Sequence, residues 1–407
     1  MTETCDVAVI GAGPAGLAAA TELKRLGIGR VVVFERFGVA GGIPRHCGHP
    51  PFGMREFARV LTGPAYARRL VRRAERAGVE IRLNHTVTAI GAGGRLTVAS
   101  LDGAGEIAAG RVLLATGNRE RTRAQRLVPG LRPVGVMNTA ALQSFLYEED
   151  RVPFRRPVIF GSELVSLSAV LSCRRHGIRP VALVETGGQV KVPRPFLLMC
   201  RALGVPVIEG AQLVSIEGQG RVSGVRLRDA AGRDLQLAAD GVIFSGQFTP
   251  EATLARASGL ALDPGTLGPS IDPVGRSSDP HVFVAGNVLH PVETAGFCWA
   301  EGRRVARIIA ADLRGPGAAA PARQSIRAGA GIRYVVPQTV TAAGPVRLNI
   351  RAEGAAKGHL YLRDAAGRTI ACRRVHGHPE KPLRLDVPAL DGDALAGALS
   401  LTLERET

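Results

Sequence analysis

Short runs of apolar residues alternate with helical patterns over the first three quarters of the chain. The first run covers residues 7–10, and a glycine-rich turn and an alanine-rich helical stretch follow it before a second run that ends at Glu35. Residues 156–185 repeat the same plan of strand, turn, helix and strand. Continuous apolar runs of this length are typical of parallel strands that are buried on both faces. The pattern predicts a duplicated α/β fold.

The pattern changes near the C-terminus to an alternation of apolar and polar residues. Residues 315–322, GPGAAAPA, are typical of a linker, and we assign 315–325 to it. Four alternating segments separated by turn residues follow at 346–352, 359–364, 383–389 and 399–405. Alternation with a period of two predicts half-buried strands, so residues 326–407 are expected to form a small β domain. The segment contains no chemical motif, which favours a covering or docking role.

The first glycine turn reads Gly11-x-Gly13-x-x-Gly16, with Pro14 and Ala15 inside it. The first glycine allows a tight turn, the second lets backbone approach a pyrophosphate, and the third lets the helix lie close to the strand. Glu35, followed by Arg36, stands where a ribose hydroxyl needs an acceptor. We predict a dinucleotide site and two Rossmann-like domains, the second inserted in the first: residues 1–122 with 240–314, and residues 123–239.

Two later segments decide between FAD and NAD. "RVLLATGNRE" (111–120) and "HVFVAGNVLHPVETAGFCWAEGRRVARIIAADL" (281–313) resemble the second and third FAD-contacting segments of the glutathione-reductase and thioredoxin-reductase superfamily. The resemblance covers residues 4–313 and implies FAD as the cofactor. Asn287 replaces the aspartate usual in that superfamily, and its amide oxygen can still accept a ribityl hydroxyl. The cofactor-binding residues implied here are Val87, Ala115, Thr116, Gly117, Gly286, Asn287, Thr294 and Ala295.

The loop "GGIPRHCGHPPFGMREF" (41–57) combines glycine, proline, histidine and cysteine. In the resembling superfamily the glycine pair passes beside the flavin phosphates, which makes Gly42 and Arg45 candidate FAD contacts. The loop then runs towards the flavin ring, so His46 and His49 are the candidate catalytic bases. The alternative is a loop folded away from the flavin. No metal site is predicted, because the spacing offers no fourth ligand.

Three segments carry a closer resemblance: "GGIPRHCGHPPFGMREFARVLTGPAYARRL", "GFCWAEGRR" and "IRYVVPQ". They resemble bacterial FAD-dependent oxidoreductases allied to the flavin subunits of amine, proline and opine dehydrogenases and of hydrogen cyanide synthase. Some of those relatives are encoded beside glycerol-3-phosphate dehydrogenases. The resemblance implies a reaction class, a small-molecule substrate and a second subunit or other electron acceptor, in a homo- or hetero-oligomer.

The repeated turn reads Gly161-x-Glu163-x-x-Ser166, so only its first glycine is kept. A carboxylate where backbone should meet a pyrophosphate adds bulk and like charge. Glu185 still ends the second strand, where it would suit a ribose. We therefore expect the fold to persist and tight NAD(P) binding to be lost, with NAD(P) kept as an alternative second cofactor.

Composition narrows the remaining possibilities. The net charge of +17 is the excess of 52 basic over 35 acidic residues. The basic residues are scattered along the chain without a nucleic-acid module, so no nucleic-acid partner is predicted. No run is long and apolar enough to predict an integral membrane segment. Six dispersed cysteines without a C-x-x-C motif, and no recognisable leader, favour a cytoplasmic protein. A Cys47 to Cys298 redox pair is a minor alternative to buried thiols.

The sequence thus predicts an FAD-dependent dehydrogenase, or its flavin subunit. A small organic substrate would give a hydride to FAD, and the electrons would leave to a partner protein or quinone. Two alternatives stay open at this point. One is an NAD(P)H-dependent flavin reductase, and the other is a non-catalytic FAD-binding scaffold subunit.

Overall fold

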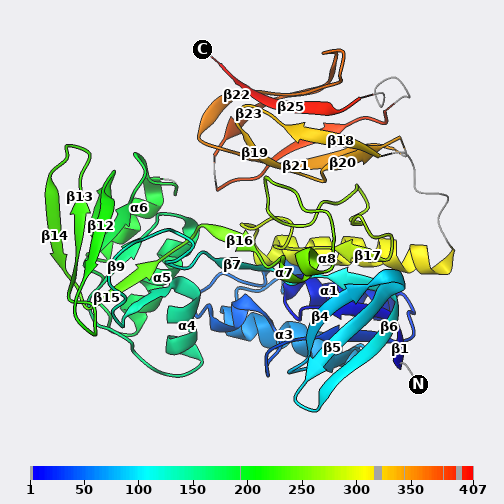
Figure 1. Cartoon of the computed structure of the whole chain (residues 1–407), viewed down its shortest axis with the longest axis horizontal. Coiled ribbons are helices and arrows are strands. Elements are labelled where there is room, and N and C mark those ends of the chain that lie inside the picture. The colour runs from blue at the N-terminus through cyan, green and yellow to red at the C-terminus, as the bar shows by residue number, and fades with distance from the viewer. Residues whose placement is uncertain are drawn as a thin grey trace.

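The computed structural model describes residues 3–192, 194–315, 323–342, 344–378, 380–390 and 397–406. Figure 1 shows two α/β parts side by side, joined by the short strands β7 and β16, with a β domain above the first part. Strand β7 (Asn118–Glu120) pairs antiparallel with β16 (Phe248–Pro250), so the chain leaves and re-enters the first part at one place.

The first part is built on a seven-stranded sheet. Its order is β3-β2-β1-β6-β5-β4, and β17 also pairs with β6. Residues 7–10 are buried, as a parallel strand covered on both faces requires. The strands are β1 (Glu3–Ile10), β2 (Val31–Phe34), β3 (Glu80–Arg82), β4 (Thr86–Gly91), β5 (Arg95–Ser100), β6 (Gly103–Leu114) and β17 (Val282–Val284).

Helices cover one face of this sheet, and they share a hydrophobic core with it. The close packing of α1 on α8 depends on Gly302, where a Cβ atom would come within 2.2 Å of the carbonyl oxygen of Ala15. The helical elements are α1 (Pro14–Arg25), η1 (Ile43–His46), α2 (Met54–Phe57), α3 (Gly63–Arg76), η2 (Ala92–Gly94) and α8 (Ala295–Arg314), together with α7 (Thr253–Ala257), which packs in the core on the opposite face.

The second part repeats the plan around a parallel sheet of order β11-β10-β9-β15-β8. Strands β9, β10 and β15 are buried along their whole length. A three-stranded sheet, β12-β13-β14, covers one side. The elements are β8 (Val136–Asn138), α4 (Thr139–Tyr147), β9 (Pro157–Phe160), α5 (Leu164–Arg175), β10 (Ala182–Glu185), α6 (Arg194–Ala202), β11 (Val207–Glu209), β12 (Gln212–Glu217), β13 (Gly224–Arg228), β14 (Asp234–Ala238) and β15 (Gly241–Phe244).

The C-terminal part consists of two packed sheets, β20-β18-β25-β22-β23 and β19-β21-β24. Strands such as β24 alternate buried and exposed residues, because one face of each sheet lies on a shared core. The strands are β18 (Arg323–Ala328), β19 (Ile332–Val336), β20 (Thr339–Thr341), β21 (Val346–Ala352), β22 (Ala356–Arg363), β23 (Thr369–Gly377), β24 (Leu383–Val387) and β25 (Leu399–Arg405).

The C-terminal part is anchored to the first part by apolar and ionic contacts. Tyr334 and Val336 are buried in the core on the second face of the first sheet. Arg351, fully buried on β21, forms an ion pair of 2.5 Å with Glu293 of the first part. Removing one partner of such a buried pair generally destabilises a protein by about 3 to 5 kcal/mol.

The α/β fold with two Rossmann-like units and an added β domain, predicted from the sequence, is confirmed. The residue bounds of the domains stay a prediction; strand β18 begins at Arg323, inside the range assigned to the linker, and residues 316–322 of that linker lie outside the described residues. Within the part of the chain that the structure describes, no helix is long and apolar enough to cross a bilayer.

Candidate functional site

A cleft of about 1110 Å³ lies where the three parts of the molecule meet. The first part supplies most of its wall, from the turn after β1, the ends of β2 and β6, the loop 41–57 and the start of α8. Helix α5 of the second part contributes Leu164, Val165 and Ser168, and the C-terminal part contributes Glu380. Residues from the whole length of the chain therefore surround one space.

Nearly all residues predicted to bind cofactor or to act in catalysis line this cleft. They are Gly11, Gly13, Pro14, Ala15, Glu35, Arg36, Gly42, Arg45, His46, His49, Val87, Ala115, Thr116, Gly117, Asn287, Thr294 and Ala295. Gly16 and Gly286 do not line it. Both pack against residues that line the cleft. A Cβ atom on Gly16 would lie 2.0 Å from the Gly11 carbonyl oxygen, and a Cβ atom on Gly286 would lie 2.8 Å from the Ala15 Cβ atom.

The first glycine turn leaves open space where a pyrophosphate must lie. Gly11 has a φ of +107°, and a Cβ atom there would come within 2.5 Å of the Ala115 carbonyl oxygen. At Gly13 a Cβ atom would meet only the Cα atom of Gly42, at 4.0 Å. The turn leads directly into the N-terminus of α1, whose first amides attract phosphate. These residues fit the diphosphate of a dinucleotide.

Glu35 ends β2 at the edge of the cleft and is buried. Its carboxylate accepts backbone hydrogen bonds from Ala12, at 3.0 Å, and from Phe37, at 3.1 Å. These bonds fix the carboxylate between the glycine turn and the next loop. A carboxylate has further lone pairs, so Glu35 retains the capacity to accept a ribose hydroxyl.

The segment before α8 is held by its own side chains. Asn287 donates to the Glu293 carbonyl oxygen at 3.0 Å and accepts from the Glu293 amide at 3.1 Å. Buried Glu301 accepts from the Gly286 amide and lies 3.1 Å from His290 Nε2. Thr294 caps α8, which begins at Ala295. The oxygen of Asn287 keeps one lone pair, and its contact with the ribityl chain stays a prediction.

The loop 41–57 packs tightly against both α/β parts. Gly48 lies on Tyr147 of α4, where a Cβ atom would come within 2.0 Å of the phenol ring. Arg45 pairs with Glu148 of the second part at 3.3 Å. The glycines of the loop thus allow it to bridge the two parts instead of folding away from the cleft.

His46 lies on this loop with both ring nitrogens buried and without a hydrogen-bond partner among the described residues. Burial, with the charge of Arg45 in support and that of Glu148 in opposition, lowers the pKa of His46 below its usual value. A neutral imidazole offers one donor and one acceptor. Buried polar atoms of this kind require partners, so His46 fits a bound ligand in the cleft.

The cysteines near the cleft have the properties of protonated thiols. All six cysteines are free. Burial, with a smaller effect of the Glu120 charge, raises the pKa of Cys47 to about 12. Burial also raises the pKa of Cys298 well above its usual value. A thiolate is the nucleophile in disulfide chemistry, so these environments oppose a dithiol relay.

His49 forms a polar contact across the two α/β parts. Its Nε2 atom lies 2.6 Å from Ser168 Oγ on α5, and its Nδ1 atom lies 2.9 Å from the carbonyl oxygen of Pro50. Gln143 on α4 donates to the same Ser168 oxygen at 2.7 Å. The predicted base is thus joined to a hydroxyl that also lines the cleft.

The second glycine turn is filled by protein. The Glu163 carboxyl carbon would lie 2.4 Å from a Cβ atom on Gly246, and one Glu163 oxygen would lie 2.9 Å from a Cβ atom on Gly161. Glu163 is buried and pairs with Lys191 at 2.8 Å. Although burial opposes it, the Glu163 charge raises the pKa of Lys191. A carboxylate and its own counter-ion occupy the place of a pyrophosphate.

The start of α5 is also engaged by protein, whereas Glu185 is held by two hydrogen bonds in the same way as Glu35. The amide of Leu164, at the start of α5, donates to Glu380 Oε2 of the C-terminal part at 3.4 Å. Burial and the nearby Glu163 charge raise the pKa of Glu380. Glu185, at the ribose position, accepts hydrogen bonds from the Ser162 hydroxyl and the Gly187 amide.

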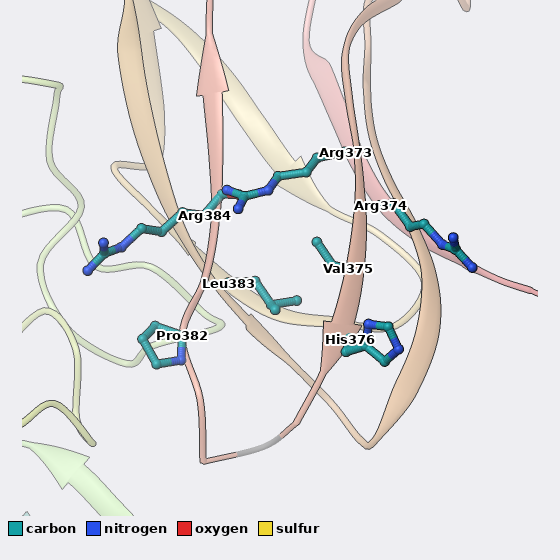
Figure 2. Close-up of a pocket in the computed structure, with 7 residues that line it drawn as sticks. All are labelled: Arg373, Arg374, Val375, His376, Pro382, Leu383 and Arg384. Atoms are coloured by element: carbon teal, nitrogen blue, oxygen red, sulfur yellow. The ribbon is translucent and has the colours of Figure 1, made fainter.

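A second hollow of about 380 Å³ lies in the C-terminal part between β23 and β24. Figure 2 shows Arg373 and Arg384 on neighbouring strands there, with Arg374 extending away from them. Arg373 donates to the Arg384 carbonyl oxygen, and Arg374 pairs with Glu406. These arginines sit along a sheet edge, where charged residues prevent edge-to-edge association.

A family model described as pyridine nucleotide-disulphide oxidoreductase matches residues 5–311. The chain belongs to this family. Members bind FAD, and NAD(P) is also used in the family. This pyridine nucleotide-disulphide oxidoreductase is therefore an FAD-dependent enzyme, as the sequence predicted, and the glycine turn, Glu35 and the size of the cleft fit that cofactor.

Individual relatives agree with this family. The chain is 30% identical over 336 residues to the glutamate synthase [NADPH] small chain of Escherichia coli, covering 74% of this chain and 67% of that one. It is 27% identical over 322 residues to one of the subunits of opine oxidase from Rhizobium meliloti, covering 70% and 59%. The crystal structure of thioredoxin reductase from T. acidophilum has a TM-score of 0.65 at 23% identity, covering 77% and 100%.

Sequence reasoning missed four residues that shape the cleft and the filled turn: Leu164, Ser168, Lys191 and Glu380. Ser168 lies in a helix whose pattern indicates only packing. Lys191 carried a signal, because lysine is rare among the 52 basic residues of this arginine-rich chain. Glu380 lies in the β domain, where no motif singles it out.

Proposed function

We propose that this protein is an FAD-dependent dehydrogenase, or the flavin subunit of one, which oxidises a small amine or alcohol. Bound FAD supplies the hydride acceptor. The glycine turn and Glu35 of the first part would hold its ADP half. The loop 41–57 and the start of α8 would border its ring, with His46 and His49 beside the substrate.

One observation carries this proposal: the Glu163 carboxylate fills the second glycine turn. Glu163 would have to leave Lys191, or become protonated, before a pyrophosphate could lie against Gly161. An uncompensated like-charge encounter in a buried site opposes binding strongly. The usual donor NAD(P)H is thereby disfavoured, and the donor is a molecule that enters the cleft directly.

The electrons must leave the flavin for an acceptor. We infer a partner subunit, another electron-transfer protein or a quinone, and a cytoplasmic setting that keeps the six thiols free. One relative is named as part of a multisubunit opine oxidase, and this supports a subunit role. The name glutamate synthase [NADPH] small chain, given to another, supports the rival hypothesis of an NAD(P)H-dependent reductase.

Anaerobic reduction of the visible flavin band separates these hypotheses. We would mix the FAD-loaded protein with L-proline, L-alanine and L-lactate as amine and hydroxy-acid probes, and with NADH and NADPH. Bleaching by at least one of the three organic probes is expected. Fast bleaching by NADH or NADPH alone would favour the reductase, and bleaching by none of the five would favour the scaffold subunit.

A further inference from the structure

We propose that Ser168 and His49 form a proton relay, in which helix α5 of the second part supplies a catalytic hydroxyl to the flavin site of the first. The relay would take the N–H or O–H proton of the donor. This inference rests on the proposed function and deepens it, because it defines the donor as one that must lose a proton together with its hydride.

The contacts assign the direction of each hydrogen bond. The Pro50 carbonyl oxygen can only accept, so His49 Nδ1, at 2.9 Å, carries the hydrogen. Nε2 is then an acceptor, and Ser168 Oγ, at 2.6 Å, donates to it. Gln143 donates to Ser168 Oγ at 2.7 Å. The hydroxyl oxygen therefore retains one lone pair for a further proton.

The relay is placed where a donor can reach it. Both Ser168 and His49 line the cleft, and Ser168 is only 8% exposed. Leu164 lies four residues earlier on α5, so it shares a helix face with Ser168. Leu164 is 43% exposed and also lines the cleft. An apolar contact beside a hydroxyl suits a small carbon skeleton that bears one amine or alcohol group.

The proposed step takes a hydride and a proton from the donor and passes them to separate acceptors. The C–H bond of the donor breaks and its hydrogen leaves with both electrons to the flavin. The N–H or O–H bond breaks on the nitrogen or oxygen attached to that carbon, and its electron pair forms the C=N or C=O double bond. That proton passes to Ser168 Oγ while the original Ser168 proton passes to His49 Nε2. The imidazolium later returns its proton to solvent.

Amine and alcohol donors differ in this respect from a reduced nicotinamide. A reduced nicotinamide gives up a hydride and becomes a cation without losing a proton. The relay would then have no proton to accept from the donor. The filled second turn and the Ser168–His49 contact are separate observations, and they point to the same class of donor.

The test compares Ser168→Ala and His49→Gln with the wild-type protein in anaerobic stopped-flow reduction by the best of the three organic probes. Positioned acid–base groups contribute about 10²- to 10⁴-fold. We expect each variant to lower the limiting rate of flavin reduction by about 100-fold. FAD content and the rate of reduction by dithionite should stay unchanged.

Ser172→Ala is the matched control. Ser172 is buried on the same helix and accepts from the same Gln143 amide, at 3.3 Å. The Ser172 hydroxyl does not hydrogen-bond to His49. The flavin of this variant should therefore be reduced at a rate within about twofold of the wild-type rate. If one relay variant loses its flavin, the other, which lies in a different part of the molecule, decides the question.

The possible failures are distinguishable. Wild-type rates in the relay variants would overturn the relay and leave the dehydrogenase intact. An equal loss in Ser172→Ala would also overturn it, because packing of α5 would then explain the effect. A wild-type flavin that no organic probe reduces would overturn the proposed function and the relay together.

Discussion

The two glycine turns start from the same plan and reach opposite outcomes. After β1, Gly13 leaves the mouth of the turn open, with only the Gly42 Cα atom nearby. After β9, Glu163 stands at the equivalent position, packs against Gly161 and Gly246, and pairs with Lys191. One residue type at one position thus separates a turn that can receive a pyrophosphate from a turn that already contains an anion.

A repeated fold can thus keep its architecture after its ligand is replaced by a side chain. The filled turn retains a buried parallel sheet and a helix that begins at Leu164. The Glu163 side chain provides the negative charge that a bound phosphate would bring. Glu380 accepts a hydrogen bond from the Leu164 amide at the start of α5. The second half thereby becomes a wall of the flavin cleft.

The largest effect is expected from copying the second turn into the first. Gly13 has a φ of −83°, which any residue adopts, and its Cβ position is open, so Gly13→Glu should fold. Its carboxylate would enter the phosphate position, and the purified protein should be colourless. Flavin absorbance and circular dichroism measure the two properties. Normal flavin content would contradict the phosphate site, and Gly13→Ala is the control for size alone.

The reverse exchange should open the second turn. Glu163→Gly removes the carboxylate, and Ser166→Gly removes a hydroxyl that bonds Ser245 at 3.0 Å behind the turn. We expect the double variant to bind NADH about 100-fold more tightly than wild type, equivalent to about 2.7 kcal/mol, and Glu163→Gly alone to recover only part. Calorimetric titration measures this. Glu163→Gln separates charge from bulk, and unchanged affinity in the double variant would refute the blocked-site explanation.

A smaller effect is expected at Asn287, on the open side of the comparison. Asn287→Leu removes both hydrogen bonds to the Glu293 backbone and the lone pair predicted to face the ribityl chain. We expect FAD binding to weaken by about 1 to 3 kcal/mol. Fluorescence titration of the apoprotein with FAD would show this, and an unchanged dissociation constant would reject the ribityl contact. Asn287→Asp, which keeps the acceptor, is the control.

The smallest effect concerns a carboxyl group beneath the filled turn. Glu120 accepts from the amides of Gly246 and Ala140, and burial, against these bonds, raises its pKa from 4.5 to about 7. Between these values the folded state holds a proton that the unfolded state has released, so stability falls as pH rises towards 7 and stays lowered above it.

Glu120→Gln removes this titration. The unfolding temperature of wild type should fall between pH 5 and pH 8 by on the order of 2 °C more than that of the variant, measured by thermal melts at both pH values. Parallel pH dependence in the two proteins would contradict the assignment. Glu106→Gln, which changes a carboxylate in an exposed region of β6, controls for net charge.

The fold could be predicted from the sequence because its signals are local. Apolar runs, glycine turns and alternating segments fix the strands and helices over short windows. The open turn was predicted for the same reason, since Gly11, Gly13 and Glu35 act through backbone geometry close to their own positions. The α/β fold with its added β domain followed from these signals.

The walls of the cleft could not be predicted, because they depend on contacts between distant segments. Ser168 meets His49 across 119 positions of the sequence, and Glu380 meets Leu164 across 216. A buried serine in a helix gives no sign of the partner that the fold brings to it. The sequence indicated that Glu163 damages the second turn, but not that Lys191 neutralises it there.

Anaerobic titration of the wild-type, FAD-loaded protein with NADH and NADPH shows whether the filled turn accepts a pyrophosphate, on which the choice of donor depends. Binding and flavin absorbance are followed in the same cuvette. We predict no saturable binding in the micromolar range and negligible bleaching of the flavin band. Stoichiometric micromolar binding with rapid bleaching by either nucleotide would contradict it.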